Sequence, residues 1–341
     1  MKVNKSITIY DIAKATQLSP SSISKIINQK GSYSEATKAK VFSAIEELGY
    51  IPNTKARQLS EGTTNIIGVD FYSRNNRNST YSNNYLVGIC NKANEFHYNV
   101  MLYNNAPSRG GNIPETIHDF DGMIFPNTDS TLYDYFNFLD RHRKPFVYTG
   151  NRLPFDYVHR NVYGGYLDYI QEVLNIFYKK GRRHILLFPQ TSYIDFMFYQ
   201  KAMIQARIEE FIREHDLDST FCSLGAYAEP GSKDLLDAID AGLAKNTPAD
   251  ALFFNSVPAS ITVYNHIQQL GLRIPEDIAI ISTAHSPTEG QEFSPPLSTI
   301  FVHAYDMGQR AVEILLHQID PEKFPELPAE IPFSFIERRS C

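Results

Sequence analysis

The chain has 341 residues, of which 43% are hydrophobic and 13% aromatic, and its formal net charge is −6. This apolar content excludes a disordered chain and is enough for the cores of two or three domains. Apolar runs such as residues 185–188 are far shorter than the roughly 20 residues of a membrane span, and residues 1–11 lack the apolar core of a signal peptide, so we expect a cytoplasmic protein without a membrane anchor.

Charge is distributed unevenly along the chain. Residues 1–60 contain nine basic and four acidic side chains, a net charge of +5, so residues 61–341 carry −11. A small basic head on a large acidic body is typical of a protein that binds a polyanion through the head. The alternative is that these charged side chains are simply solvated on a helical surface and bind no partner.

The first 30 residues contain the signals of two short helices. Thr8 and Asp11 have the spacing of a capping box, which predicts a helix over residues 9–15. Ser19 as the N-cap and Pro20 at the first helical position predict a second helix after a turn of about four residues. Its inward-facing residues are Ile23, Ile26 and Ile27.

A third helix is predicted after Ser34 or Thr37 and ends at Gly49. Three short helices of this kind form a helix-turn-helix unit. The second helix then turns its polar side chains outward, where hydroxyls can donate to phosphate oxygens and a lysine can reach a base edge or a phosphate in the major groove. These outward residues are Ser21, Ser22, Ser24 and Lys25.

The segments "TIYDIAKATQLSPSSISKIIN" and "SEATKAKVFSAIEELGYIPNTKARQLS" resemble the headpiece and hinge of the LacI/GalR family of bacterial transcription regulators. By this resemblance the DNA contacts of the headpiece are Thr8, Ser19, Pro20, Ser21, Ser22, Ser24, Lys25 and Asn28. Two residues depart from the family pattern: Lys25 stands where Arg is usual, which removes a bidentate fork for guanine, and Gln17 stands where Gly is usual. The operator sequence therefore cannot be transferred from relatives.

Residues 51–64 join the head to the body. Ala56 and Leu59 share one face of a short segment that Gly62 ends, and so short a helix is stable only when it packs on a partner or on DNA. In the family this hinge helix pairs across a dimer in the minor groove and wedges a leucine between bases, which assigns that role to Leu59. The hinge contacts implied are Asn53, Ala56, Arg57 and Leu59; the alternative is that Leu59 packs on the body.

The body, residues 65–341, alternates short apolar runs with amphipathic stretches. Strands are predicted in "NIIGVDF", "NVMLYN", "DGMIFP", "PFVYTG", "HILLFP", "ALFFN" and "IAIIST", and a helix in "YLDYIQEVLNIFYKKG". Strand followed by helix, repeated, predicts an α/β fold with parallel sheets that are covered on both faces. Ligands of such sheets bind beyond the carboxyl ends of the strands.

The segments "VYGGYL", "KKGRRHILLF", "LGLRIPEDIAIIS" and "PPLSTI" extend the family resemblance over the body. It implies a periplasmic-binding-protein-like body of two Rossmann-like lobes with a ligand between them. Lobe one then takes residues 65–160 and 292–320, and lobe two takes residues 161–291 and 321–341.

The expected ligand contacts depart from the family pattern: Tyr199 replaces an arginine, Asn255 and Ser256 stand for "ND", Ala284 and His285 replace an acidic pair, and Val302 replaces a polar residue. Most of the charged partners of a sugar hydroxyl are therefore missing, which disfavours a standard free-hexose inducer. Rings near strand ends could stack on an effector or could belong to the core: Phe71, Tyr72, Phe125, Tyr148 and Phe196. The residues we select as ligand contacts are Phe71, Phe125, Tyr199, Asn255, Ser256 and His285.

Catalytic chemistry is disfavoured because the sequence has no GxSxG, HExxH, Walker or GxGxxG motif. Three widely separated cysteines outside any CxxC pattern predict reduced thiols, and we expect no metal and no cofactor. We predict a homodimeric DNA-binding regulator, a repressor of a carbohydrate-related operon, controlled by a sugar, a phosphosugar or a related metabolite. The alternatives are control by a protein co-regulator or by no effector, and a metabolite-binding enzyme or receptor.

Overall fold

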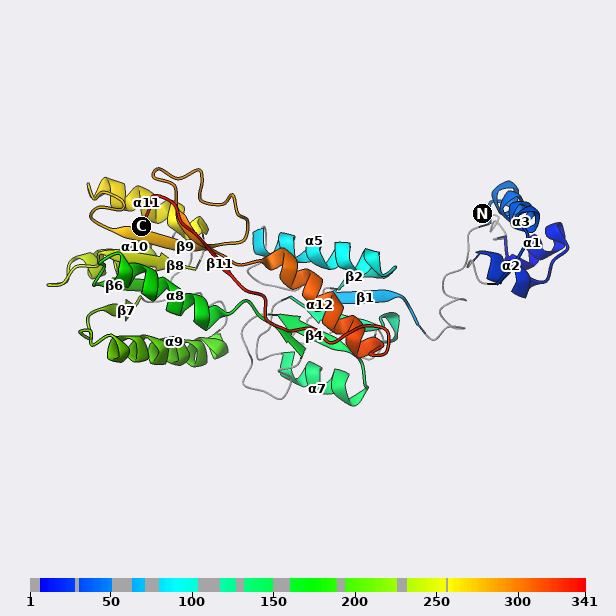
Figure 1. Ribbon diagram of the computed structural model, residues 1–341, viewed down its shortest axis with the longest axis horizontal. Helices are drawn as coiled ribbons and strands as arrows, with labels where there is room; N and C mark the ends of the chain where they lie inside the picture. Colours follow the sequence, from blue (N-terminus) through cyan, green and yellow to red (C-terminus); the bar gives the residue numbers. More distant parts are fainter. Residues whose placement is uncertain are drawn as a thin grey trace. The chain divides into compact units, whose positions relative to one another are not determined.

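The computed structural model describes residues 7–27, 31–50, 63–70, 80–103, 117–126, 132–149, 160–188, 194–225, 232–255 and 257–341, with the side chains of 194–200 left out. It divides into two compact units, Met1–Thr64 and Asn65–Cys341 (Figure 1). Within the described ranges, none of the helices combines the length and the apolar character that crossing a bilayer would require.

The first unit is the predicted trio of helices: α1 (Ile9–Thr16), α2 (Pro20–Ile27) and α3 (Glu35–Leu48). Ser34 is the cap of α3, since its hydroxyl accepts from the amide of Thr37 at 3.2 Å. Gly49 ends α3 with φ 64°, a left-handed conformation that glycine adopts without strain. The helices bury one small core, made of Ile12, Ile23, Ile26, Val41 and Ala44.

The first sheet of the body has the order β2-β1-β3-β4-β5, and all of its pairs are parallel. Its strands are β1 (Ile66–Asp70), β2 (Asn99–Tyr103), β3 (Gly122–Phe125), β4 (Phe146–Thr149) and β5 (Asn161–Val162), and a 3-10 turn, η2 (Ile117–Asp119), precedes β3. Helices α5 (Thr80–Glu95) and α12 (Ala304–Ile319) pack on one face, and α7 (Tyr133–Arg141) packs on the other (Figure 1).

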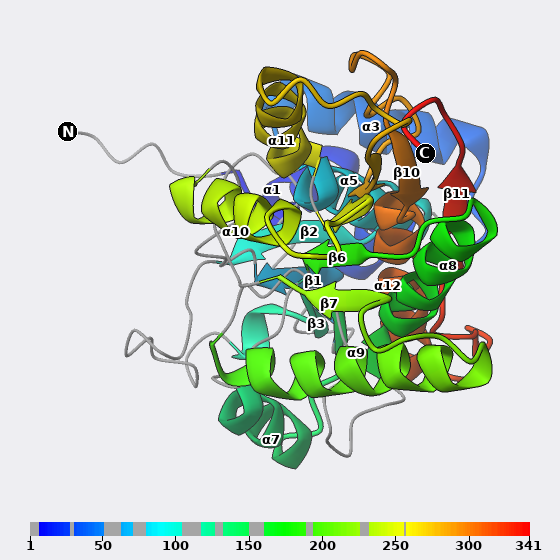
Figure 2. The same cartoon turned by 90° about the vertical axis from the view of Figure 1, so that its left-hand side faces the viewer.

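The second sheet has the order β11-β10-β9-β8-β6-β7, and β11 is its one antiparallel neighbour among the described strands. Its strands are β6 (Ile185–Phe188), β7 (Cys222–Leu224), β8 (Ala251–Phe254), β9 (Ala279–Ala284), β10 (Ser298–Phe301) and β11 (Ser334–Ile336). Figure 2 shows α8 (Tyr166–Lys179) and α9 (Ile194–Glu214) on one side of it, opposite α10 (Lys233–Leu243) and α11 (Val257–Gln269).

The predicted α/β architecture of parallel sheets with covered faces is confirmed, and all seven predicted strands are present. Two predicted boundaries are wrong. Residues 292–320 were assigned to lobe one, but β10 pairs with β9 in the second sheet. Lobe two was predicted to begin at residue 161, but β5, at residues 161–162, pairs with β4 in the first sheet. The chain therefore returns to lobe one after β10, through α12. The apolar residues of β10 would suit a strand of the second sheet or a segment that crosses between the lobes. The sequence therefore did not show which lobe this segment belongs to.

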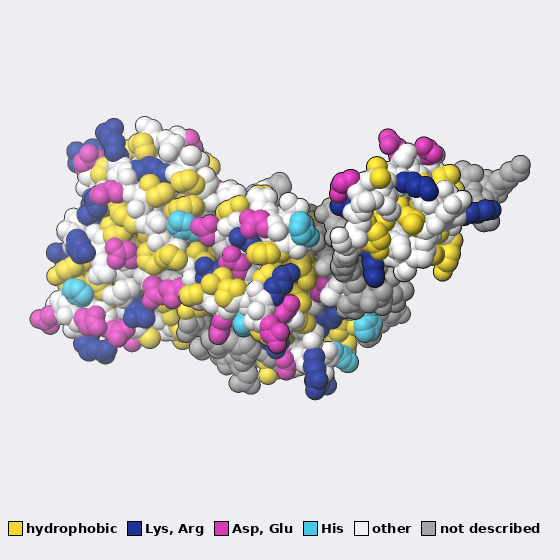
Figure 3. All heavy atoms as spheres, turned by 45° about the vertical axis from the view of Figure 1, so that its right-hand side comes forward, with side chains coloured by type: hydrophobic (Ala, Val, Ile, Leu, Met, Phe, Trp, Pro, Cys, Tyr) yellow, Lys and Arg dark blue, Asp and Glu magenta, His cyan; other side chains and the backbone are white. Residues whose placement is uncertain are grey.

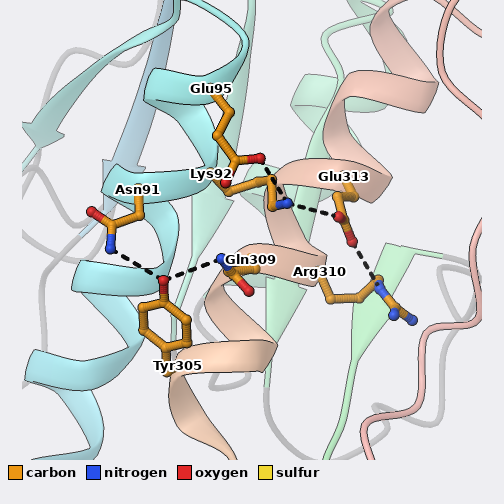
Figure 4. A network of polar contacts seen from close by, with 7 residues as sticks. All are labelled: Asn91, Lys92, Glu95, Tyr305, Gln309, Arg310 and Glu313. Atoms are coloured by element: carbon orange, nitrogen blue, oxygen red, sulfur yellow. Dashed lines mark hydrogen bonds and ion pairs between the residues drawn. The ribbon is translucent and has the colours of Figure 1, made fainter.

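Helices α5 and α12 lie side by side along lobe one (Figure 4). Gly88 and Gly308 allow the two backbones to touch, because a Cβ on Gly88 would lie 2.1 Å from the carbonyl oxygen of Tyr305. Two polar contacts join the helices: Asn91 Nδ2 donates to Tyr305 Oη (3.1 Å), and Lys92 pairs with Glu313 (3.3 Å). Contacts within each helix support them: Gln309 Nε2 to Tyr305 Oη (3.2 Å), Lys92 to Glu95 (2.9 Å) and Arg310 to Glu313 (3.1 Å).

Candidate nucleic-acid interface and inter-lobe site

Helix α2 turns one face into the core of the head and the other to solvent. Ile23 and Ile26 are buried, whereas Ser21 and Lys25 are exposed and Ser22 and Ser24 are half-buried. The spacing of the isoleucines produces this division, since residues three or four apart share a helix face. The exposed face of α2 therefore combines hydroxyl groups with a cation, which suits contacts to phosphates and base edges.

Hydroxyl groups also gather at the beginning of α2. The Ser19 oxygen accepts from the amide of Ser22 at 3.1 Å and lies 2.9 Å from the hydroxyls of Ser21 and Ser22. Pro20 occupies the first helical position, as predicted. The backbone amides of a helix N-terminus attract anions, so this end of α2 adds to the polar face.

Thr8, one of the predicted DNA contacts, forms hydrogen bonds within the head. Its amide and its hydroxyl both donate to the carboxylate of Asp11, at 2.8 and 2.7 Å, which fixes the start of α1. The remaining predicted DNA contacts, Asn28, Asn53, Ala56, Arg57 and Leu59, lie outside the described residues, so their roles stay predictions.

On the face drawn in Figure 3, Lys and Arg side chains of the head lie beside exposed hydrophobic ones.

Of the aromatic rings selected for the ligand, Phe125 has a different role from the one expected. It is fully buried under α7, with ring centroids 5.6 Å from Tyr135 and 5.0 Å from Phe136. Tyr148 is also fully buried and stacks on Phe136 at 5.5 Å. Both rings belong to the core of lobe one, which is the alternative that the sequence left open for them.

Other selected positions fall where the structure gives no side-chain account. Phe71, Tyr72 and Ser256 lie outside the described residues, and the side chains of Tyr199 and Phe196, in α9, do as well. Their roles in ligand binding stay predictions.

Asn255 follows the carboxyl end of β8, where a ligand of such a sheet is expected. Its Oδ1 accepts from the hydroxyl of Tyr169 at 3.0 Å. Tyr169 comes from the first turn of α8, and burial raises the pKa of its hydroxyl well above the ordinary value, so the group remains a neutral donor. The pair joins a strand end to a covering helix.

His285 lies where the two lobes meet. Its carbonyl accepts from Asn84 Nδ2 of α5 at 2.6 Å, and its ring stands edge-on to Tyr81 of α5 with centroids 5.0 Å apart. Its amide donates to Glu289 Oε2 at 2.6 Å, which closes the turn after β9. Burial lowers the pKa of His285 to about 4, against the opposing effect of the Glu289 carboxylate, so the ring is neutral near pH 7.

Tyrosines of α5 extend this cluster into lobe one. Burial raises the pKa of Tyr81 to about 12, while a hydrogen bond with Thr149 at the end of β4 opposes the rise. Tyr85 stacks on Tyr81 with centroids 5.9 Å apart. The sequence analysis did not select Tyr81, Tyr85 or Tyr169. Tyr81 and Tyr169 lie in the first turns, and Tyr85 in the second turn, of helices that follow β1 and β5. This position was the available signal, because the beginnings of such helices lie at the carboxyl edge of a parallel sheet.

Comparison with known proteins matches residues 8–53 to the family described as "Bacterial regulatory proteins, lacI family", and residues 174–341 to "Periplasmic binding protein-like domain". The repressor PurR of Aliivibrio fischeri is 29% identical over 336 residues, covering 92% of this chain and 91% of PurR. Catabolite control protein A of Priestia megaterium is 22% identical, covering 98% and 99%.

Solved structures share the fold. The lac repressor dimer bound to operator and the anti-inducer ONPF aligns with a TM-score of 0.77 at 19% identity, over 98% of this chain and 99% of that one. A complex of the transcriptional regulator CelR with cellobiose aligns with a TM-score of 0.66 at 19% identity, over 98% and 100%.

Proposed function

Because the chain belongs to the lacI family of bacterial regulatory proteins and is a DNA-binding transcription regulator, we propose that it represses a carbohydrate-related operon as a homodimer. Helix α2 enters the major groove of the operator. The observation that carries this proposal is the division of α2 into a buried isoleucine face and an exposed face with Ser21 and Lys25.

Two heads are needed for specificity. One head of this size buries too little DNA for a specific complex, whereas two heads related by a two-fold axis read two half-sites of a pseudo-palindrome. In this proposal the hinge segments pair across the dimer, and Leu59 inserts into the minor groove between them.

An effector then acts through the body. We place it beyond the carboxyl ends of the strands, between lobes that meet at His285, and its binding changes the free energy of the operator complex through the hinge. The effector is a sugar or a related metabolite. One relative is named as a transcriptional repressor and another as a catabolite control protein, and both names fit control by a metabolite.

The test compares Lys25→Ala with Lys40→Ala, which removes the same charge from an exposed lysine of the same head, on α3. Operator duplexes are first selected from a random library with the wild-type protein. If Lys25 reads a base, Lys25→Ala weakens the selected duplex by about 1 kcal/mol, or roughly fivefold, and weakens random DNA less. Equal losses on both duplexes would reassign Lys25 to a phosphate, and a loss no larger than that of Lys40→Ala would remove α2 from the interface.

A further inference from the structure

A cavity of about 300 Å³ lies at the C-terminal end of α12, in lobe one. Its lining combines side chains from the last turns of α12 with side chains of the loop that follows: Ile314, His317, Gln318, Pro321, Glu326 and Leu327. A helix rises 1.5 Å per residue, so Gln318 lies roughly 20 Å from Ala304 at the other end of α12, where the chain leaves β10. The cavity is therefore separate from the inter-lobe site.

The electrostatic potential at this cavity is negative. The loop of residues 320–333 contains four acidic side chains and one basic side chain. One of the acids, Glu326, lines the cavity and is exposed, while the basic residue, Lys323, lies over the ring of Phe324 with its Nζ 5.0 Å from the centroid. The C-terminal end of a helix adds the negative end of its dipole. A cation is therefore favoured in the cavity, and an anion is repelled.

Two polar side chains of α12 have one ring or amide atom left for a ligand. The Oε1 atom of Gln318 accepts from the amide of Phe146 at 3.2 Å, which fixes the orientation of the carboxamide because a backbone amide only donates. Its Nε2 is buried and has no partner within the described ranges. His317 Nδ1 donates to the carbonyl of Phe324 at 2.7 Å, so Nε2 carries the lone pair in the neutral ring.

The remaining wall of the cavity is apolar and consists of Ile314, Pro321 and Leu327. A volume of this size is at the lower end of the roughly 300–1,000 Å³ of small-molecule sites. A buried N–H without a partner is unfavourable, and an acceptor that enters the cavity beside Gln318 would complete it. The walls thus suit a small molecule with a positive charge, an apolar body and a hydrogen-bond acceptor.

We propose that this cavity binds a small organic cation with the chemistry of an amino-acid amide. Its ammonium group faces Glu326, its apolar body lies against Ile314 and Leu327, and its carbonyl oxygen accepts from Gln318. The inference does not rest on the proposed function, because the cavity uses neither α2 nor the inter-lobe site.

The first test compares two probes of the same body and carbonyl that differ in charge: L-leucinamide, a cation, and N-acetyl-L-leucinamide, which is neutral. Each is added at millimolar concentration to the full chain at pH 7. L-Leucinamide should raise the thermal midpoint by about 2 °C, and the neutral probe should raise it by less than half as much. Equal shifts for the two probes, or no shift with L-leucinamide, would overturn the proposal.

The second test places the cation at Glu326. Glu326→Gln keeps the size of the side chain and removes its charge, and Glu322→Gln does the same to an exposed acid of the same loop that does not line the cavity. By calorimetric titration, Glu326→Gln should weaken L-leucinamide about fivefold, whereas Glu322→Gln should keep the wild-type affinity. Equal losses in the two variants would assign the effect to the general charge of the loop and remove the site.

The third test fills the cavity. Leu327→Trp adds a large ring to its wall, and Leu270→Trp adds the same ring to a leucine of the body that is 48% exposed and does not line the cavity. Leu327→Trp should abolish the binding of L-leucinamide, and Leu270→Trp should leave it unchanged. Retained binding in Leu327→Trp would refute the cavity as the site. If Leu327→Trp does not unfold cooperatively, the comparison of the two glutamine variants decides.

Operator binding by the same proteins separates this inference from the proposed function. Wild-type protein that binds its selected duplex but not L-leucinamide would remove only the cavity site. Wild-type protein that binds L-leucinamide but no duplex selectively would refute only the proposed function.

Discussion

The contact between α5 and α12 gives the sharpest test of how lobe one is held together. A Cβ on Gly88 would lie 2.1 Å from the carbonyl oxygen of Tyr305, and a Cβ on Gly308 would lie 2.2 Å from the carbonyl oxygen of Tyr85. Both obstacles are backbone atoms, which cannot rotate away as a side chain can. We therefore expect Gly88→Ala to force the two helices apart.

Two opposing effects determine how much Gly88→Ala changes the free energy of unfolding. Alanine favours a helix over glycine by about 1 kcal/mol, which would stabilise α5. Overpacking a well-packed contact costs about 3 kcal/mol when backbone must shift, because neighbouring buried side chains such as Ile89 and Ala311 lose contacts as well. The net loss is about 2 kcal/mol, which lowers the thermal midpoint of a domain of this size by about 5 °C.

The assay is thermal unfolding of the full chain, with Asn83→Ala as the control. Asn83 is exposed on the same helix, so alanine there gains helix propensity without meeting α12. Asn83→Ala should leave the midpoint unchanged or slightly higher. If Gly88→Ala also leaves the midpoint unchanged or raises it, the close approach of the two backbones is not what fixes this helix pair.

Two further predictions concern the backbone of the head and the titration of the body. Gln17 holds a left-handed conformation with φ 58°, so Gln17→Gly should stabilise the head by about 1 kcal/mol and slow amide hydrogen exchange of Ile23 about fivefold. Gly49→Ala, at φ 64°, should speed the exchange of Ile23. Equal exchange rates in the two variants would contradict backbone strain at these positions. The pKa of His285 is lowered to about 4 in the folded chain from 6.5, so its stability contribution is complete above pH 6.5 and falls as pH drops toward 4, by up to about 3 kcal/mol. Urea unfolding of His285→Gln should lack this part of the pH dependence, and wild-type and variant curves that stay parallel from pH 7 to 4 would refute it.

The fold was largely predictable because its signals are local. Caps such as Thr8, Ser34 and Gly49 mark helix ends within a few residues, and strands buried on both faces appear as continuous apolar runs. Four strands were not predicted, and they are short: β5 has two residues, β7 and β11 have three each, and β10 has four. Runs of this length give no periodicity, and only pairing with a neighbour makes them strands.

The inter-lobe site was predictable only in part. Asn255 and His285 follow strands whose carboxyl ends are recognisable in the sequence, and the structure gives both of them polar partners. Tyr169 and Asn84 reach the same region from helices, and no local pattern reports that a helix 86 or 201 residues away will touch a strand end. Phe125 was selected as a ligand contact because its ring lies near a predicted strand end. The strand is apolar on both faces, so the sequence does not show that this ring packs under α7.

The contacts of His285 also define how a movement at the proposed ligand site would spread. Asn84 joins the turn after β9 to α5, so a displacement of the turn that keeps this bond displaces α5 as well. Gly88 and Gly308 hold α5 against α12 by backbone contact, and packed backbones move together or separate but do not deform gradually. Helix α12 directly follows β10 of the second sheet. The first turns of both helices are therefore joined to lobe two: α5 through the Asn84 hydrogen bond and α12 through the chain itself. A ligand that shifts His285 therefore acts on lobe one through one rigid pair of helices, and Gly88→Ala would alter the response to a ligand without changing any residue that touches it.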